Sequence, residues 1–322
     1  MSSAPDPQRR SDAACRTGLP VASEINLCRS FRPSEYLEPA SVEEATRLLD
    51  RYGARARIIA GGTDLLLERD PGIEVLIGVR SLALDVVRVG ARGGTIGAAA
   101  RFAELASTPA LAEQPYRALA QAAGAMGTPQ IRNQASIGGN LCSAVSCADA
   151  PPPLLALDAT LEVAGPTGAR SIAIADFFED ARTPSLRGGE ILTAVHLPEL
   201  PRRSATRFIK KGRVRTGDLA VVNLAVRLTL DADDSCSEAR IALGAVAPTP
   251  VRTRGAEAML VGRRPEDSLL TEVAARAAEE IEPIDDIRAS ADYRRILARS
   301  LLYRALREAV EDLAGGNPTS DA

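Results

Sequence analysis

A pair of glycines follows a short apolar run near the start of the chain and is the first stretch suited to holding an anion. Gly61 and Gly62 lie in RIIAGGTDLLLERD, residues 57–70. Glycine tolerates backbone angles closed to other residues, so several N–H groups in such a loop can face one point and bind a phosphate. A second interpretation is a tight strand-to-helix turn in which Thr63 and Asp64 cap the segment LLLER. The segment alone leaves both interpretations open.

A second glycine pair, Gly138 and Gly139, lies 77 residues further on, in GTPQIRNQASIGGNLCSAVSCADAPPPLLALDA, residues 127–159. Five consecutive residues there offer backbone donors, a hydroxyl and an amide: Ser136, Ile137, Gly138, Gly139 and Asn140. Asp149 adds a carboxylate suited to sugar or ribityl hydroxyls. No G-x-G-x-x-G follows a strand and no Gly-Lys-Ser/Thr ends a glycine loop, which argues against an ordinary dinucleotide fold and a P-loop NTPase.

The few histidines and cysteines limit which metal sites and catalytic groups the chain can form. His196 is the only histidine, so a multi-histidine zinc site is excluded, and we interpret it as an exposed strand residue of ILTAVHLPEL. Cys142 and Cys147 have C-x4-C spacing, which is part of a ferredoxin-type ligand run. Two further ligands are missing nearby, so we expect structural cysteines and no metal site. We assign no catalytic side chain.

The bulk composition indicates an ordinary globular protein of two or three packed units. The chain has 322 residues, 45% of them hydrophobic, and a net charge of −3. That balance provides no basic surface for a nucleic acid. Five scattered cysteines suggest a reducing, cytoplasmic setting, and no apolar run is long enough for a membrane span. Residues 1–29 lack apolar periodicity and are expected to form a flexible extension.

Apolar periodicity predicts a mixed α+β protein. Ser41 and Glu44 have capping-box spacing before a helix over 41–52 that Gly53 ends. Strands and helices then alternate up to a strand-rich region over 160–200. Three antiparallel strands are expected within 207–214, 219–230 and 239–253, followed by helices over 266–281 and 289–314. The last helix has a predicted apolar stripe of Tyr293, Ile296, Leu297, Leu301 and Leu302.

These motifs, in this order, resemble the FAD-binding subunit of the xanthine dehydrogenase and carbon monoxide dehydrogenase family of molybdenum hydroxylases. AGGTDLL, GTPQIRNQ, SIGGN, EILTAVHLP, FIKKGR, GAVAPTPVR and DDIRASADYRRILARSLLYRAL carry the resemblance, from about residue 31 to 312. It implies an α+β fold: a vanillyl-alcohol-oxidase-type (PCMH-type) FAD-binding domain over 30–202, with subdomains of about 30–100 and 101–202. A CO dehydrogenase flavoprotein-like C-terminal domain over 203–313 and a disordered tail over 314–322 would follow.

The resemblance also implies which residues contact FAD. Two segments would hold the pyrophosphate through backbone N–H groups: Ile59, Ala60, Gly61, Gly62, Thr63, Asp64, Leu65 and Leu66 in the first, and Ser136, Ile137, Gly138, Gly139 and Asn140 in the second. Asp149 would bind cofactor hydroxyls, and Leu192 and Lys210 match positions that contact the flavin. Lys210 and Lys211 are the only lysines in the chain, so Lys210 either has a specific task or belongs to a solvated basic strand end.

The function implied is electron transfer within a larger oxidoreductase. FAD in this chain would receive electrons from [2Fe-2S] clusters in a small subunit, supplied by a large molybdenum-cofactor subunit, and pass them to an external acceptor. A dimer of heterotrimers is implied. Two alternatives remain: a self-contained FAD-dependent reductase or oxidase of the same fold, and a scaffold subunit that has lost the cofactor. Substrate and acceptor are not encoded in this chain's motifs.

Overall fold

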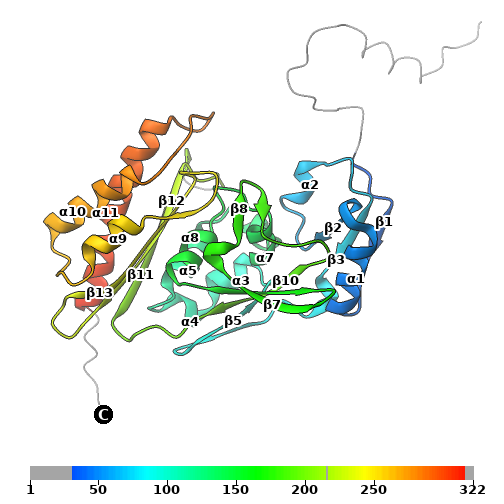
Figure 1. The fold of residues 1–322 in the computed structure, drawn as a ribbon, viewed down its shortest axis with the longest axis horizontal. Helices are drawn as coiled ribbons and strands as arrows, with labels where there is room; N and C mark the ends of the chain where they lie inside the picture. Colours follow the sequence, from blue (N-terminus) through cyan, green and yellow to red (C-terminus); the bar gives the residue numbers. More distant parts are fainter. Residues whose placement is uncertain (1–30, 215–216, 316–322) are drawn as a thin grey trace, which may run out of the picture.

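The computed structural model describes residues 31–214 and 217–315, arranged as three units in a row (Figure 1). The N-terminal unit lies at the right of the figure, the central unit in the middle and the C-terminal unit at the left. The predicted extension over 1–29 lies outside the described residues. So does most of the predicted tail, although Ala314 and Gly315 still belong to the last helix. None of the described helices combines the length and apolarity that a membrane crossing needs.

The N-terminal unit is a small parallel sheet with one long helix. Its elements are β1 (Glu35–Leu37), α1 (Val42–Tyr52), η3 (Gly53–Arg55), β2 (Ala56–Ile59), α2 (Leu65–Glu68), β3 (Val75–Gly78) and η4 (Arg80–Leu82), with strand order β1-β3-β2. The predicted helix is confirmed: the Glu44 N–H donates to Ser41 Oγ (3.2 Å), and Gly53 ends the helix with φ 55°. Apolar side chains of α1 and β3 form the core of this unit.

The central unit contains a five-stranded antiparallel sheet covered by short helices. The strands of this sheet are β4 (Val87–Gly90), β5 (Gly93–Gly97), β6 (Thr160–Gly165), β7 (Gly168–Ala173) and β10 (Ile191–Leu197). A separate two-stranded sheet consists of β8 (Phe178–Asp180) and β9 (Thr183–Pro184). The helices of the central unit are α3 (Phe102–Ser107), α4 (Pro109–Ala112), α5 (Arg117–Ala125), α6 (Pro129–Arg132), α7 (Ile137–Cys142), α8 (Pro151–Ala156) and η5 (Ile174–Asp176). The strand order β4-β5-β10-β6-β7 places β4 and β5 in the five-stranded sheet of the central unit. This favours a subdomain boundary near residue 85, whereas the sequence predicted one near residue 100.

The C-terminal unit contains four antiparallel strands where the sequence pattern predicted three. They are β11 (Ser204–Lys211), β12 (Val222–Leu230), β13 (Cys236–Gly244) and β14 (Val251–Arg252), followed by α9 (Arg254–Leu260), α10 (Asp267–Glu279) and α11 (Ala291–Gly315). The predicted third strand over 239–253 is divided into β13 and β14. Ala245 adopts φ 63° directly after β13, and the prolines that precede β14 cannot donate to a ladder, so the chain folds back as a hairpin.

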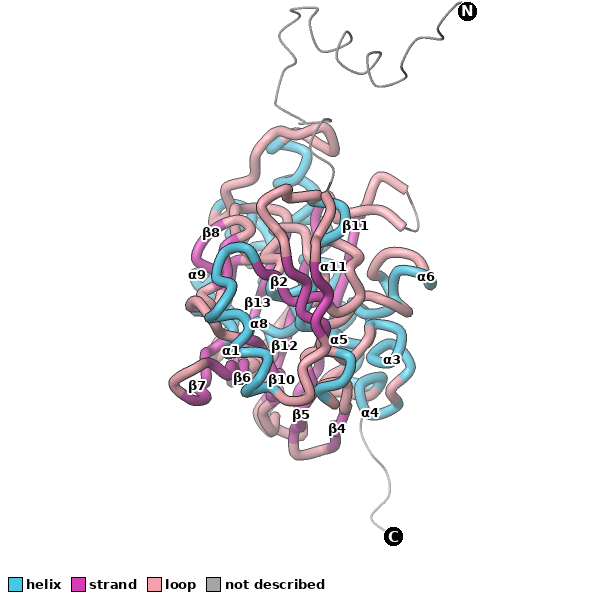
Figure 2. The backbone as a smooth tube through the Cα atoms, turned by 90° about the vertical axis from the view of Figure 1, so that its right-hand side faces the viewer, coloured by secondary structure: helices cyan, strands magenta, loops and turns pink. Residues whose placement is uncertain are grey.

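Both faces of the C-terminal sheet are covered, which explains why every residue of β12 is buried. Ala225 and Phe208 face α5 and α8 of the central unit, whereas Leu224 and Ile209 face α10 and α11. Side chains alternate between the two faces of a strand, so neighbouring residues contribute to different cores. Viewed from the N-terminal unit, the three sheets lie one behind another (Figure 2).

The predicted apolar stripe of α11 is wrong in its first turns. Tyr293 and Ile296 are 46% and 65% exposed, whereas Arg294 is 1% exposed. Its guanidinium donates through Nη1 to the backbone oxygens of Val221 (2.7 Å) and Ala245 (2.8 Å), and through Nη2 to Asp286 Oδ1 (2.6 Å). These acceptors let an arginine occupy the buried face, a position that hydrophobicity alone assigns to its neighbours.

The Asp286 carboxylate is expected to stabilise this corner in a pH-dependent way. Burial opposes its ionisation, but hydrogen bonds from Arg288 and the backbone outweigh burial and hold the pKa of Asp286 well below its usual range. Asp286→Asn should lower the free energy of unfolding at pH 7 by about 2 kcal/mol. A carboxyl with a lowered folded-state pKa stabilises above its unfolded pKa and loses that effect as the pH falls, so the deficit should shrink below about pH 4.

Urea unfolding of both proteins between pH 7 and pH 3 measures this deficit. The matched control is Asp292→Asn, because the Asp292 side chain is 93% exposed and forms a salt bridge with Arg295 on the helix surface. A deficit that stays constant across the pH range would contradict the assigned role of the Asp286 charge.

Candidate cofactor site

The two glycines of the first segment serve different purposes. Gly62 has φ 69°, a conformation that side chains rarely adopt, so it makes the turn between β2 and α2. Gly61 has no such angle, but a Cβ there would overlap the carbonyl oxygen of Gln134. Backbone of the second glycine region therefore lies directly against Gly61. Around Gly62, the side chains of Ile59 and Leu66 fill the space that a Cβ would enter.

The first segment carries unused backbone donors. Among the described residues, the N–H groups of Gly61, Gly62, Thr63 and Asp64 donate no hydrogen bond within the chain. The Asp64 side chain occupies the N-cap position of α2 without capping it, and its Oδ2 lies 3.5 Å from Arg182 Nη1. The helix-cap interpretation of the Asp64 side chain is therefore wrong. These half-buried N–H groups are the expected binding groups for an anion.

The second segment differs, because its donors are already used. Ile137 donates to the Ala100 oxygen (2.9 Å), Gly138 to the Ala98 oxygen (2.8 Å) and Gly139 to Ser136 Oγ (3.1 Å). Asn140 donates its N–H to the Ser136 oxygen, and its side-chain oxygen accepts from the Ala150 N–H (3.1 Å). The second segment therefore offers a ligand a rigid surface with fixed side chains, and few free backbone N–H donors.

Its two glycines also have separate roles. A Cβ at Gly138 would lie 2.6 Å from the Ala98 oxygen, so this glycine lets α7 lie against the segment after β5. A Cβ at Gly139 would meet only Ser136 Oγ, at 3.1 Å, and Gly139 is exposed. Gly139 therefore borders open space.

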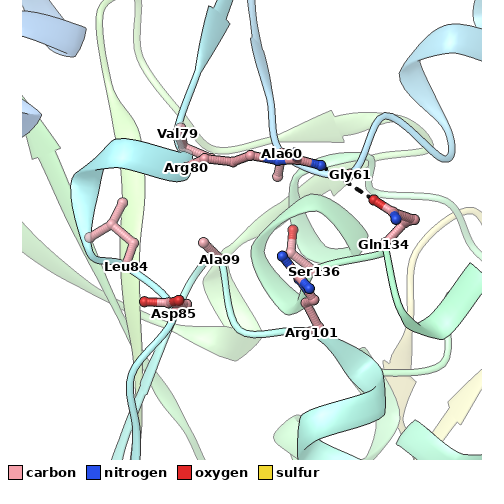
Figure 3. Close-up of a pocket in the computed structure, with 10 residues that line it drawn as sticks. All are labelled: Ala60, Gly61, Val79, Arg80, Leu84, Asp85, Ala99, Arg101, Gln134 and Ser136. Carbon is pink, nitrogen blue, oxygen red and sulfur yellow. Dashed lines mark hydrogen bonds between the residues drawn. The ribbon is translucent and has the colours of Figure 1, made fainter. Parts of the chain in front are cut away.

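A pocket lies where the two segments meet, between the N-terminal and central units (Figure 3). Its lining residues are Ala60, Gly61, Val79, Arg80, Leu84 and Asp85 from the first unit and its connection, and Ala99, Arg101, Gln134 and Ser136 from the central unit. Arg80 spans the gap, with Nη2 3.4 Å from Gln134 Oε1. The structure therefore brings together residues from both predicted glycine segments. Leu65, which begins α2, is half-buried beside the same loop and is absent from the pocket wall.

Asp149 and Lys210 lie elsewhere, at the contact between the central and C-terminal units. Asp149 is 4% exposed, and its Oδ2 lies 2.6 Å from Lys210 Nζ. Its Oδ1 accepts from Asn223 Nδ2 (2.9 Å), and Asn223 stands directly across from Lys210 in the β11–β12 ladder. Burial raises the pKa of Asp149, and the ammonium and the amide oppose that rise. Lys210 is thus no part of a solvated strand end.

Leu192 and His196 occupy β10, the middle strand of the central sheet. Leu192 is 4% exposed, packs in the core and pairs with Val163 of β6. A register shift follows it, between Leu192 and Ala194. His196 is only half-buried, with Nδ1 3.0 Å from Thr95 Oγ1 and Nε2 3.0 Å from Glu162 Oε2. Its contacts are with neighbouring strands.

The C-x4-C cysteines are held apart from the pocket. Burial raises the pKa of the Cys142 thiol to about 12, so the thiol is protonated at neutral pH. Cys147 is buried beside Ala220 and Ala245. Over residues 31–214 and 217–315, no group of three or more histidine, cysteine or carboxylate side chains is placed to hold a metal ion.

Three residues near these sites had no signal in the sequence. Arg80 and Arg101 look like any of the chain's arginines, and Asn223 lies in an apolar strand where nothing local marks it. Asn223 is fully buried, and its Oδ1 has no hydrogen-bond partner among the described residues. Only the fold places these three side chains, because each meets neighbours that are distant in the sequence: Arg80 and Asn223 across an interface between units, and Arg101 beside Ser136 within the central unit.

Comparison with known proteins identifies the family to which the chain belongs. The family described as the FAD binding domain in molybdopterin dehydrogenase matches residues 29–200, and the CO dehydrogenase flavoprotein C-terminal domain matches residues 207–309. Subunit alpha of the 6-hydroxypseudooxynicotine dehydrogenase complex of Paenarthrobacter nicotinovorans is 32% identical over 86% of this chain and 94% of its own length. The xanthine dehydrogenase FAD-binding subunit of Escherichia coli O157:H7 is 30% identical over 89% of this chain and 99% of its own length.

A solved structure shows the same fold. A chain of the carbon monoxide dehydrogenase from Hydrogenophaga pseudoflava superimposes with a TM-score of 0.82 at 31% identity, covering 87% of this chain and 98% of that one. The fold and the site thus define an α+β, FAD-binding member of an oxidoreductase class. The chain belongs to the family of FAD-binding subunits of molybdenum hydroxylases, which confirms the resemblance seen in the sequence. Its cofactor is FAD.

Proposed function

We propose that this chain is the electron-transfer subunit of a molybdenum hydroxylase complex, passing electrons from iron–sulfur clusters through FAD to an external acceptor. Its partners would be a large molybdenum-cofactor subunit and a small subunit with [2Fe-2S] clusters, in a dimer of heterotrimers. Support comes from relatives that match nearly end to end and are themselves named as subunits of dehydrogenases. A chain that corresponds to one such subunit needs partners to act on substrate.

The observation that carries the cofactor assignment is the set of four unused N–H groups at Gly61 to Asp64, next to the pocket between two units. Such a loop can bind a pyrophosphate without any side chain. On this proposal Ile59 to Leu66 hold the pyrophosphate from one side. Ser136 to Asn140 form the other side, where Gly139 leaves room for the ligand. The residues present therefore fit a dinucleotide.

Two of the remaining assigned residues, Asp149 and Lys210, lie where the C-terminal unit meets the central unit. Asp149 is proposed to bind hydroxyls of the cofactor, with Lys210 and Leu192 of β10 near the flavin. Asp149 already accepts from Lys210 and Asn223, so its carboxylate is fixed before any ligand binds. Bound FAD supplies the redox chemistry by taking up electrons singly or in pairs, and the chain's own residues orient it and exclude water.

Purification from cells that produce the large and small subunits together with this chain tests the proposal. A yellow complex with a flavin absorption spectrum, in which all three chains are present in equal amounts, is expected. The same chain produced alone should retain FAD and show no substrate oxidation. Colourless protein that takes up no added FAD would refute the cofactor assignment, and substrate turnover by the isolated chain would refute its role as a dependent subunit.

A further inference from the structure

Two arginines line the pocket from opposite units. Arg80 begins η4 in the N-terminal unit, directly after β3. Arg101 precedes α3 in the central unit and pairs with Ser136 through an isolated bridge, so its position is tied to the second glycine segment. Figure 3 shows Arg80 crossing the upper side of the pocket toward Gln134, while the Arg101 guanidinium lies beside Ser136.

Both guanidiniums carry charge that the chain itself does not neutralise. Within the described ranges, neither Arg80 nor Arg101 forms a salt bridge. The single hydrogen bond of Arg80 is the 3.4 Å contact with Gln134. Asp85 is the one carboxylate among the ten lining residues and lies on the Leu84 side of the pocket. The pocket wall therefore has an excess of positive charge beside the unused N–H groups.

This combination suits a ligand with two adjacent negative charges. Guanidinium groups bind phosphate oxygens through charge-assisted hydrogen bonds, which are stronger than those from neutral backbone donors. The glycine loop provides donors but no net charge to balance a pyrophosphate. Two cations on facing walls provide that balance, one from each unit.

We propose that Arg80 and Arg101 bind the two phosphates of FAD from opposite walls of the pocket. This assignment rests on the proposed position of the pyrophosphate at the first glycine segment. Arg80 exchanges its weak contact with Gln134 for a phosphate oxygen when FAD binds. Arg101 binds the other phosphate beside Ser136. The pair thereby joins the N-terminal and central units through the ligand.

The test is FAD titration of the full-length apoprotein carrying Arg80→Gln, Arg101→Gln or both, with riboflavin and inorganic pyrophosphate as probes. Each single change should weaken FAD binding about tenfold. Riboflavin binding should be unchanged, since riboflavin has no phosphate. Inorganic pyrophosphate should compete with FAD in the wild-type protein and lose most of that effect in the double variant.

The matched control is Arg92→Gln, which removes the same charge from an exposed turn between β4 and β5. It should bind FAD like the wild type, and thermal unfolding of each variant should stay near the wild-type temperature. If the wild type binds FAD and the pocket variants bind it equally well, the arginine assignment is wrong. An equal loss of FAD and riboflavin binding also overturns it. If the wild type binds no FAD, the proposed function itself fails.

Discussion

Gly139→Val is expected to fold like the wild-type protein and to retain less than roughly a tenth of its FAD, since the added methyl groups occupy the ligand's space. A Cβ at this exposed position meets nothing but Ser136 Oγ, at 3.1 Å, so the fold accommodates the change once that hydroxyl shifts by a few tenths of an ångström. The added side chain extends into the space that we assign to the pyrophosphate. Flavin absorbance per mole of purified protein measures the effect.

Gly124→Val is the matched control for this variant. Gly124 is also an exposed helical glycine, in α5, and a Cβ there meets nothing within 4 Å. Both changes therefore place the same side chain on a helix surface, and only Gly139 belongs to a segment that we assign to the cofactor. Equal FAD content in the two variants would show that Gly139 does not face the cofactor. Changes at Gly61 are less informative, because a Cβ there overlaps Gln134 and disturbs the fold itself.

Lys210→Met is expected to lower the free energy of unfolding by about 3 kcal/mol at pH 8, because it leaves a buried carboxylate without its cation. The side chains of Lys210 and Asp149 are 10% and 6% exposed, and solvent cannot replace the lost partner. FAD binding should weaken as well, since Asp149 loses its fixed orientation. Urea unfolding and FAD titration measure the two effects separately.

The pH dependence of this deficit identifies its cause. Without Lys210, the pKa of Asp149 rises further above its ordinary value, because burial acts unopposed by the ammonium. A carboxyl with a raised folded-state pKa destabilises the fold as the pH rises through that pKa. The deficit should therefore be smaller at pH 5 than at pH 8.

Two further variants separate charge from packing. Adding Asp149→Asn to Lys210→Met removes the unpaired charge and should restore most of the lost stability. Lys211→Met changes the only other lysine, which is exposed at the end of β11, and should have no effect. A double variant no more stable than Lys210→Met alone would mean that the lysine stem, rather than its charge, stabilises this interface.

Sequence patterns predicted a helix or strand correctly where residues within that element determine its ends. The capping box at Ser41 and the glycine at 53 are contained within the helix they delimit, so α1 was predicted to within a residue. The buried face of α11 was not, because two of the acceptors that let Arg294 be buried, the backbone oxygens of Val221 and Ala245, lie far away in the sequence. Hydrophobic periodicity carries no information about such acceptors.

The candidate site shows the same division. The glycine segments were visible because a loop that must approach backbone closely is restricted to glycine. The reason for Gly61, a carbonyl at Gln134, became apparent only once the two segments were placed together. Arg80, Arg101 and Asn223 have ordinary neighbours in the chain, and only contacts with residues distant in the sequence distinguish them. Their positions in the folded chain indicate their roles, and neither their residue types nor their spacing in the sequence predicted them.

The contact between Gly61 and Gln134 joins main chain to main chain. Side chains can change rotamer or mutate, but two backbones in contact have no adjustable spacer between them. The distance between the walls of the pocket is therefore set by the peptide units, and the residues that line it only decide which groups project inward. Substitutions in the lining can alter affinity while the gap itself keeps its width.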